Sequence, residues 1–307
     1  RLPVKRRQDA VIYKLTPERR QKVAEIFAGY LEKGYIRPLT PAEVVDQDSR
    51  YLPFFCVVDE SKDTTPVRVV WDCRAIYHGK SLNSEIEETP NRLQNLFKVL
   101  MRLRRYRYTL TSDVSEMFLR ILLAKKDRPY HRFHLDGQDY EWNSVLFGNV
   151  ASPNASQKVI AMACEMFGAA YPEAVESLMS SLYMDDVSDS RQTEEEVLAL
   201  AQQLMGLLDH CSMPIHKFYS NSPLVVNSLD PKLLAKQINI GENLLEFEAG
   251  KILGMRYNAS PEEDYLSFAG KFKNIREWTN KAQTTIIEPG KWTKRCVARA
   301  AASVDDP

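Results

Sequence analysis

Three aspartates stand where apolar segments of this sequence end, and they are the residues best suited to chemistry. Asp113 closes "YTLTSD", and Asp185 and Asp186 follow "SLYM". Adjacent carboxylates repel one another, and burying an unpaired carboxylate is unfavourable. A hairpin turn would explain the adjacent pair, because aspartate is a common turn residue. A divalent cation would explain all three, because it needs carboxylates that converge on one point.

The Tyr-x-Asp-Asp tetrapeptide at 183–186 does not by itself decide between these alternatives, because short motifs recur by chance. If the two strands are neighbours, three carboxylates meet at one sheet edge, and cations are needed to relieve their repulsion. Two Mg²⁺ ions about 4 Å apart, or Mn²⁺ in their place, would create a site for phosphoryl transfer. Otherwise Asp185 and Asp186 form a turn and Asp113 caps a helix.

The elements that must position these aspartates include helices and a hairpin before Asp113. Thr16 and Pro17 mark the start of a helix, and Gly34 marks its end. Apolar runs at 54–58 and 67–71 flank a polar tip, which predicts a hairpin. A helix from about Arg92 to Arg105 then leads into the strand that ends near Asp113.

The second half of the chain also contains predicted helices and strands. Ser152 is predicted to cap a helix that begins at Pro153, and Thr193 with Glu196 forms a capping box. A strand is predicted at 252–258, and a helix begins near residue 291. Strands, helices and hairpins are interspersed, which favours an α+β fold over a doubly wound parallel sheet.

Composition narrows the class of protein. The 307 residues are 44% hydrophobic and 27% charged, which is typical of a globular chain of two or more lobes. The net charge is zero, so nucleic-acid binding would depend on local patches. The basic run at 102–108 is interpreted as solvated surface at a helix end, with contact to a phosphate backbone as the alternative. Five scattered cysteines argue against zinc and fit a reducing compartment.

No signal peptide or bilayer-spanning segment is found in the sequence. The chain opens on Arg1 and ends at Pro307 just after a helical pattern, so we expect a fragment of a longer protein.

Six sequence blocks occur in an order that resembles reverse transcriptases, most closely those of Bel/Pao-type long-terminal-repeat retrotransposons. The similarity runs from about Thr16 to the end of the chain. The blocks are the finger hairpin "YLPFFCVVDESKDTTPVRVVWDCRA" with "GKSLNSEI"; "LTSDVSEMFLRILLAKKDRPYHRF"; "VLFGNVASPNASQ"; "LYMDDV"; "MPIHKFYSNS" followed by "ILGMRYN"; and "KWTKRCVARAAASVDDP". Six blocks in order are more specific than any one of them.

The resemblance implies a right-handed polymerase with an antiparallel palm sheet backed by helices. Fingers would span about 1–88 and 121–152, and palm about 89–120 and 153–258. Residues 259–307 would hold only the start of a thumb or connection.

The resemblance also implies the catalytic residues. Asp113 and Asp185 would bind both metal ions, with Asp186 in support, and Val114 would join the metal ligands. Lys217 would protonate the leaving pyrophosphate, although a solvated loop lysine is the alternative.

The expected substrate contacts come from several blocks. Lys62 and Arg68 would clamp the nucleotide's phosphates, against the alternatives of a solvated hairpin tip and a surface ion pair. Phe118 would lie beneath the sugar and exclude ribonucleotides, unless it is simply part of the core. The remaining expected contacts are Phe147, Gly148, Gln157, Tyr183, Met184, Gly254 and Met255.

One block departs from the family pattern. Retroviral members have Pro-Gln-Gly, whereas this chain has Leu146, Phe147 and Gly148. A phenylalanine cannot donate the glutamine's hydrogen bond, but it can stack on a sugar or base. Gln157 would reach the template base or make a local polar contact.

The implied function is template-directed DNA synthesis on an RNA or DNA template with a primer and deoxynucleoside triphosphates. Protease, RNase H and integrase segments would accompany the polymerase. No membrane is expected as a partner. The location would be cytoplasmic, with virus-like particles as one setting. The first alternative is a decayed or domesticated copy that binds nucleic acid without catalysis. The second is a two-metal nuclease, which the finger hairpin with Arg68 disfavours because a hydrolase has no triphosphate to clamp.

Overall fold

The computed structural model describes residues 2–45, 48–58, 67–87, 90–235, 250–252, 255–259 and 264–268. The chain divides into two compact units, Arg1–Ala235 and Lys236–Pro307. The first unit contains two separate hydrophobic cores, which we call the fingers core and the palm core. The predicted limits of fingers and palm stay predictions.

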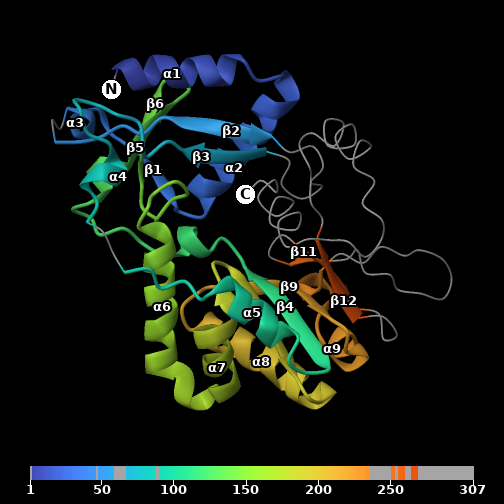
Figure 1. Cartoon of the computed structure of the whole chain (residues 1–307). Helices are drawn as coiled ribbons and strands as arrows, with labels where there is room; N and C mark the ends of the chain where they lie inside the picture. Colours follow the sequence, from blue (N-terminus) through green and yellow to red (C-terminus); the bar gives the residue numbers. More distant parts are fainter. Residues whose placement is uncertain are drawn as a thin grey trace, which may run out of the picture. The chain divides into compact units, whose positions relative to one another are not determined.

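The fingers core is enclosed by helices, a hairpin and a small sheet (Figure 1). The helices are α1 (Leu2–Tyr13), α2 (Pro17–Glu32), α3 (Pro41–Val44), α4 (Leu82–Glu85) and the 3-10 turn η2 (Arg128–His131). The hairpin consists of β2 (Phe54–Val58) and β3 (Val67–Trp71), and the sheet, in spatial order, of β1 (Ile36–Pro38), β6 (Gln138–Trp142) and β5 (Arg132–Leu135).

Sequence signals for α2 and the hairpin are confirmed. The Thr16 hydroxyl accepts a hydrogen bond from the N–H of Arg19, and Pro17 opens the helix. Gly34 follows the helix with φ +71°, in the left-handed region that favours glycine. The hairpin pairs Phe54 with Trp71, and both rings are fully buried in the fingers core.

The palm core lies between a four-stranded antiparallel sheet and the helices packed on it. The strands, in spatial order, are β7 (Leu182–Tyr183), β8 (Asp186–Arg191), β4 (Tyr108–Val114) and β9 (Ile215–Ser220). The helices are α5 (Leu96–Leu103), α6 (Ser152–Phe167), α7 (Pro172–Ser181), α8 (Glu194–Asp209) and α9 (Pro223–Ser228), with 3-10 turns η1 (Met117–Arg120), η3 (Gly168–Ala170) and η4 (Pro231–Leu233).

Burial of apolar side chains explains why the helices pack on the palm sheet. Leu110 of β4, Val187 of β8 and Leu200 of α8 are all completely buried in the palm core. The capping box predicted for α8 is present, because Thr193 and Glu196 satisfy each other's backbone N–H groups. The strand predicted before Asp113 is also confirmed, as β4.

Two predicted helix starts were wrong. The helix expected from Arg92 begins at Leu96, where the Asn95 side chain accepts the N–H of Lys98, and it ends at Leu103. Ser152 is the first residue of α6 and not its cap, since Ala151 occupies the cap position without a side-chain hydrogen bond, and the Ser152 hydroxyl donates to the Leu146 carbonyl at 2.8 Å.

The second unit contains one antiparallel sheet among its described residues, formed by β10 (Gly250–Ile252), β11 (Met255–Ala259) and β12 (Asp264–Phe268). The strand predicted at 252–258 falls on β10 and β11. The helix predicted near residue 291 lies outside the described residues. Across the described ranges, no helix has the length and apolar character needed to cross a membrane.

Candidate active site

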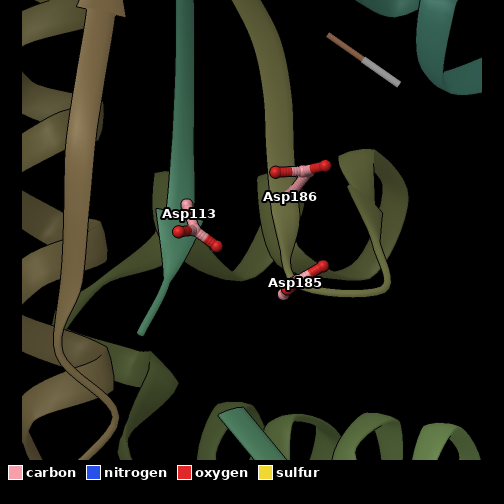
Figure 2. A group of neighbouring side chains, drawn as sticks. All are labelled: Asp113, Asp185 and Asp186. Carbon is pink, nitrogen blue, oxygen red and sulfur yellow. The ribbon is translucent and has the colours of Figure 1, made fainter. Parts of the chain in front are cut away.

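The three aspartates converge at one end of the palm sheet (Figure 2). Strands β4 and β8 pair antiparallel with Asp113 directly opposite Asp186, and Asp185 lies in the turn that precedes β8. One carboxylate oxygen from each aspartate lies within 4.8 Å of the others. The turn considered as the alternative is present at Asp185, whereas Asp186 lies in β8 and Asp113 lies in β4 and not at a helix cap.

A strained two-residue turn aims Asp185 at its neighbours. Tyr183 of β7 pairs with Asp186 of β8, and Met184 between them has φ +56°, which is unfavourable for a residue with a side chain. The N–H of Val114 donates to the Asp185 carbonyl at 2.8 Å, and the Gln157 amide donates to the Met184 carbonyl at 3.2 Å. These bonds fix the turn against β4 and α6.

Burial and mutual repulsion raise the pKa values of two carboxyl groups in the cluster. Burial, followed by the charges of Asp185 and Asp113, raises the pKa of Asp186 to about 7. Asp185 reaches solvent, yet the protein packed around it and then the Asp113 charge raise its pKa as well. The charges of Lys217 and Arg68 act in the opposite direction on Asp185. Negative charge is thus concentrated at this sheet edge and is only partly compensated by nearby basic side chains.

The donor set fits a hard divalent cation. Three carboxylates offer oxygen ligands at short mutual distances, which is the chemistry that Mg²⁺ and Mn²⁺ prefer. The Val114 side chain is buried in the palm core, so this residue could contribute a ligand only through its main-chain carbonyl.

Two residues of β9 reach the same carboxylate. The Lys217 ammonium donates to Asp113 Oδ2 at 2.6 Å, and the backbone of Lys217 has φ +55°. The His216 ring nitrogen Nδ1 lies 3.0 Å from the Asp113 carbonyl, and Nε2 lies 3.7 Å from Oδ2. The expected lysine therefore lies in the site. His216 was missed, because only its place beside Lys217 could have indicated it.

Arg68 lies on β3 with an exposed side chain, and its charge lowers the pKa of Asp185. No salt bridge of Arg68 is found within the part of the chain that the structure describes, so the surface ion pair considered for it is not observed there. Lys62, at the predicted tip of the same hairpin, lies outside the described residues.

Two phenylalanines among the expected substrate contacts form an aromatic pair. The ring centroids of Phe118 and Phe147 are 5.3 Å apart with an interplanar angle of 59°. Phe118 is half-buried, whereas its neighbours Met117 and Leu119 are both 3% exposed. Phe118 is therefore not part of either core, and Phe147 is 39% exposed.

Gly148 follows Phe147 and must be glycine. Its φ is +98°, and a Cβ atom there would lie 2.1 Å from the carbonyl oxygen of Trp71. The Asn83 side chain donates to the Gly148 carbonyl at 3.0 Å and accepts the N–H of Val150 at 3.1 Å. The loop that carries Phe147 is thus fixed directly against the end of β3.

The last two expected substrate contacts, Gly254 and Met255, belong to the second unit. Gly254 lies outside the described residues, and Met255 begins β11 in the second unit, where side chains are not described. Tyr183 and Met184 lie at the end of β7 and in the turn, and both are half-buried.

Comparison with known family models finds a match over the part of the chain that contains this site. Residues 67–218 match the family model described as "Reverse transcriptase (RNA-dependent DNA polymerase)". That range contains all three aspartates, Arg68, Phe118 and Lys217. A comparison with curated proteins finds no match.

Solved structures of foamy viral proteins share the fold. A foamy viral protease-reverse transcriptase in complex with dsDNA covers 95% of this chain at 17% identity and a TM-score of 0.56, and the match spans 49% of that protein. The dRH form with ds DNA covers 94% at 16% identity and a TM-score of 0.51, over 50% of its length. The selenomethionine-labelled CSH mutant of the prototype foamy virus protein covers 66% at 19% identity and a TM-score of 0.51, over 24% of its length.

At these identities the likeness shows the fold alone, and it is the palm and fingers fold of a polymerase. The α+β class expected from the sequence is thereby confirmed. This chain spans half or less of the length of the proteins that it resembles.

Proposed function

Residues 67–218 form a reverse transcriptase domain, and we propose that the chain extends a primer along an RNA or DNA template by two-metal nucleotidyl transfer. The observation that supports this most is the convergence of Asp113, Asp185 and Asp186 within 4.8 Å at one sheet edge. Such a cluster needs cations, and two divalent cations held by it suit phosphoryl transfer.

The protein's own residues would divide the work as follows. Asp113 and Asp185 would hold the cations with Asp186 in support, and such cations would supply Lewis acidity toward the primer 3′-hydroxyl and the triphosphate. Lys217, whose ammonium now lies on Asp113, is placed to move a proton to the leaving pyrophosphate. The raised pKa of Asp186 means that cation binding displaces a proton from the cluster.

The nucleotide would lie between the cluster and the fingers. Arg68 would bind its phosphates as a planar fork, with Lys62 as a further positive charge. Phe118 would lie against the sugar, and Phe147 beside Gly148 would offer an aromatic surface to sugar or base. Gln157 would act on the site through the carbonyl of Met184. Gly254 and Met255 would hold the primer terminus.

The finer assignment is also a proposal. The sequence blocks favour a Bel/Pao-type retrotransposon polyprotein, in which protease, RNase H and integrase segments accompany the polymerase in the cytoplasm or in virus-like particles. The foamy viral proteins of similar fold are protease-reverse transcriptases, and two of them were solved with double-stranded DNA. A primer–template duplex and deoxynucleoside triphosphates are the partners we propose here.

Primer extension on a homopolymer RNA template, with Mg²⁺ or Mn²⁺ and the matching deoxynucleotide, tests the proposal. We expect the labelled primer to lengthen only when divalent cation and nucleotide are both present. Binding of the duplex without extension would instead indicate a copy that has lost catalysis. Shortening of the primer or template would indicate a nuclease.

A further inference from the structure

Glu116 has an unusual backbone and lies between two residues of the site. It follows Asp113 by three positions and precedes Phe118 by two. Its φ is +53°, in the left-handed region that is unfavourable for a residue with a Cβ atom. It is also the residue from which the 3-10 turn η1 begins. Strain of this kind persists only where the surroundings fix it.

Three donors hold the Glu116 carboxylate. The Lys33 ammonium donates to Oε1 at 2.6 Å, the Tyr35 hydroxyl to Oε2 at 2.8 Å, and the Arg120 guanidinium to Oε2 at 3.3 Å. Lys33 and Tyr35 lie between α2 and β1 on the fingers side, 83 and 81 residues away in sequence. Such charge-assisted bonds are stronger than neutral ones. Glu116 therefore connects the start of η1 to the fingers.

The tyrosine is suited to this role. Tyr35 is 6% exposed, and burial, with the hydrogen bond to Glu116, raises its pKa to about 12. Its hydroxyl thus remains a donor across the physiological range. Removing the acceptor would leave a buried hydroxyl without this partner, which is unfavourable.

The turn η1 itself joins the two cores. Met117 packs in the palm core with Leu110, whereas Leu119 packs in the fingers core with Trp71. Phe118 lies between these two anchors and is only half-buried. The direction in which its ring points therefore depends on how η1 enters from Glu116.

We propose that Glu116 is a positioning residue that, through Lys33 and Tyr35, fixes Phe118 against the sugar of the incoming nucleotide. The inference rests on the proposed polymerase function, and it adds a determinant of sugar selectivity that lies on the fingers side. A displacement of about 1 Å in a substrate-positioning group can reduce a rate by about two orders of magnitude. Loosening of η1 should therefore change nucleotide use before it changes duplex binding.

The variant Tyr35→Phe tests this with little disturbance, because it removes one hydroxyl and retains the buried ring. Tyr130→Phe is the matched control, since the Tyr130 hydroxyl also donates to a carboxylate of the fingers, Asp48 Oδ2, at 2.8 Å. Single-nucleotide incorporation by the full chain is measured with deoxy- and ribonucleotides, beside a melting curve. We expect Tyr35→Phe to raise KM for deoxynucleotide and to lower the preference for deoxyribose by about tenfold. Tyr130→Phe should leave both unchanged.

A double variant shows whether the effect passes through Phe118. In a Phe118→Val background, adding Tyr35→Phe should change the sugar preference no further, because the ring that it positions is gone. Additive changes, or an unchanged sugar preference in Tyr35→Phe when wild type is active, would overturn the inference and leave the polymerase proposal intact. A wild-type chain that does not extend primers would overturn both.

Discussion

Asp185 combines two properties that the sequence presents as alternatives. It occupies a tight turn after a two-residue strand, and its carboxylate lies within reach of Asp113 and Asp186. The turn makes the geometry possible, because a continuous strand would send adjacent side chains to opposite faces. At this position the turn and the proposed metal-ligand role depend on each other.

Replacing Asp185 by Asn should abolish primer extension and leave duplex binding nearly unchanged. The change removes a negative charge from the cation site, whereas duplex affinity comes mainly from phosphate contacts elsewhere. Extension assays and duplex titrations measure the two properties. Asp136→Asn is the control, because Asp136 is an exposed aspartate with φ +47° in the β5–β6 hairpin of the fingers. More than a few per cent of residual extension would contradict the assignment of Asp185 as a metal ligand.

Phe118→Val should admit ribonucleotides while retaining deoxynucleotide use. Under the proposed placement, the half-buried Phe118 ring, paired with Phe147, would leave no room for a 2′-hydroxyl and would offer it no hydrogen bond. The expected gain is roughly 10–200-fold in ribonucleotide incorporation relative to wild type. Incorporation kinetics for both sugars and a melting curve check it. A loss of stability with both substrates slowed alike would show that Phe118 serves packing.

At the scale of elements, the finger hairpin carries Arg68, whose positive charge acts on Asp185. Arg68→Ala should raise the apparent KM for nucleotide more than it weakens duplex binding, because a guanidinium fork on phosphates acts mainly on the nucleotide. Steady-state kinetics at saturating duplex give the first quantity, and duplex titration gives the second. Arg74→Ala, another exposed arginine shortly after β3, serves as a control. Equal losses in both quantities would assign Arg68 to the duplex backbone or to the fold.

The elements differ in how much of them the sequence reveals. The hairpin β2–β3, α2 and α8 have local signals in apolar runs and caps, and all three were predicted. Strands β5 and β6 were missed, because their buried positions are partly polar. Arg132 lies 3.2 Å from Glu141, and both side chains are 3% exposed, so a sequence pattern reads them as surface.

The residues of the candidate site also differ in whether the sequence marks them locally. Asp113, Asp185 and Asp186 were predicted because strand ends and a short motif mark them locally. Glu116 and His216 were not predicted, because Glu116 bonds to Lys33, 83 residues away along the chain, and His216 to Asp113, 103 residues away. Long-range contacts of this kind leave no local pattern.

At the scale of the whole molecule, the chain's net charge of zero hides a local excess of negative charge at the sheet edge. The raised pKa of Asp186, about 7 against an ordinary value of 3.8, makes the cluster a contributor to global stability. The folded state binds an extra proton between these two values. This contribution is therefore complete below about pH 4 and is lost as the pH rises through about 7.

A divalent cation should replace that proton and reverse the loss. Without divalent ions, we expect the melting temperature of wild type to fall between pH 5 and pH 8 relative to that of Asp186→Asn, which cannot titrate there. The comparison must be a difference, because the buried His131 has a lowered pKa and contributes the opposite slope. Adding Mg²⁺ or Mn²⁺ at pH 8 should stabilise wild type by about 2.7 kcal/mol at a hundred times the dissociation constant, and Asp186→Asn by much less. Parallel curves for the two proteins, with and without cation, would show that the cluster neither repels itself nor binds a cation.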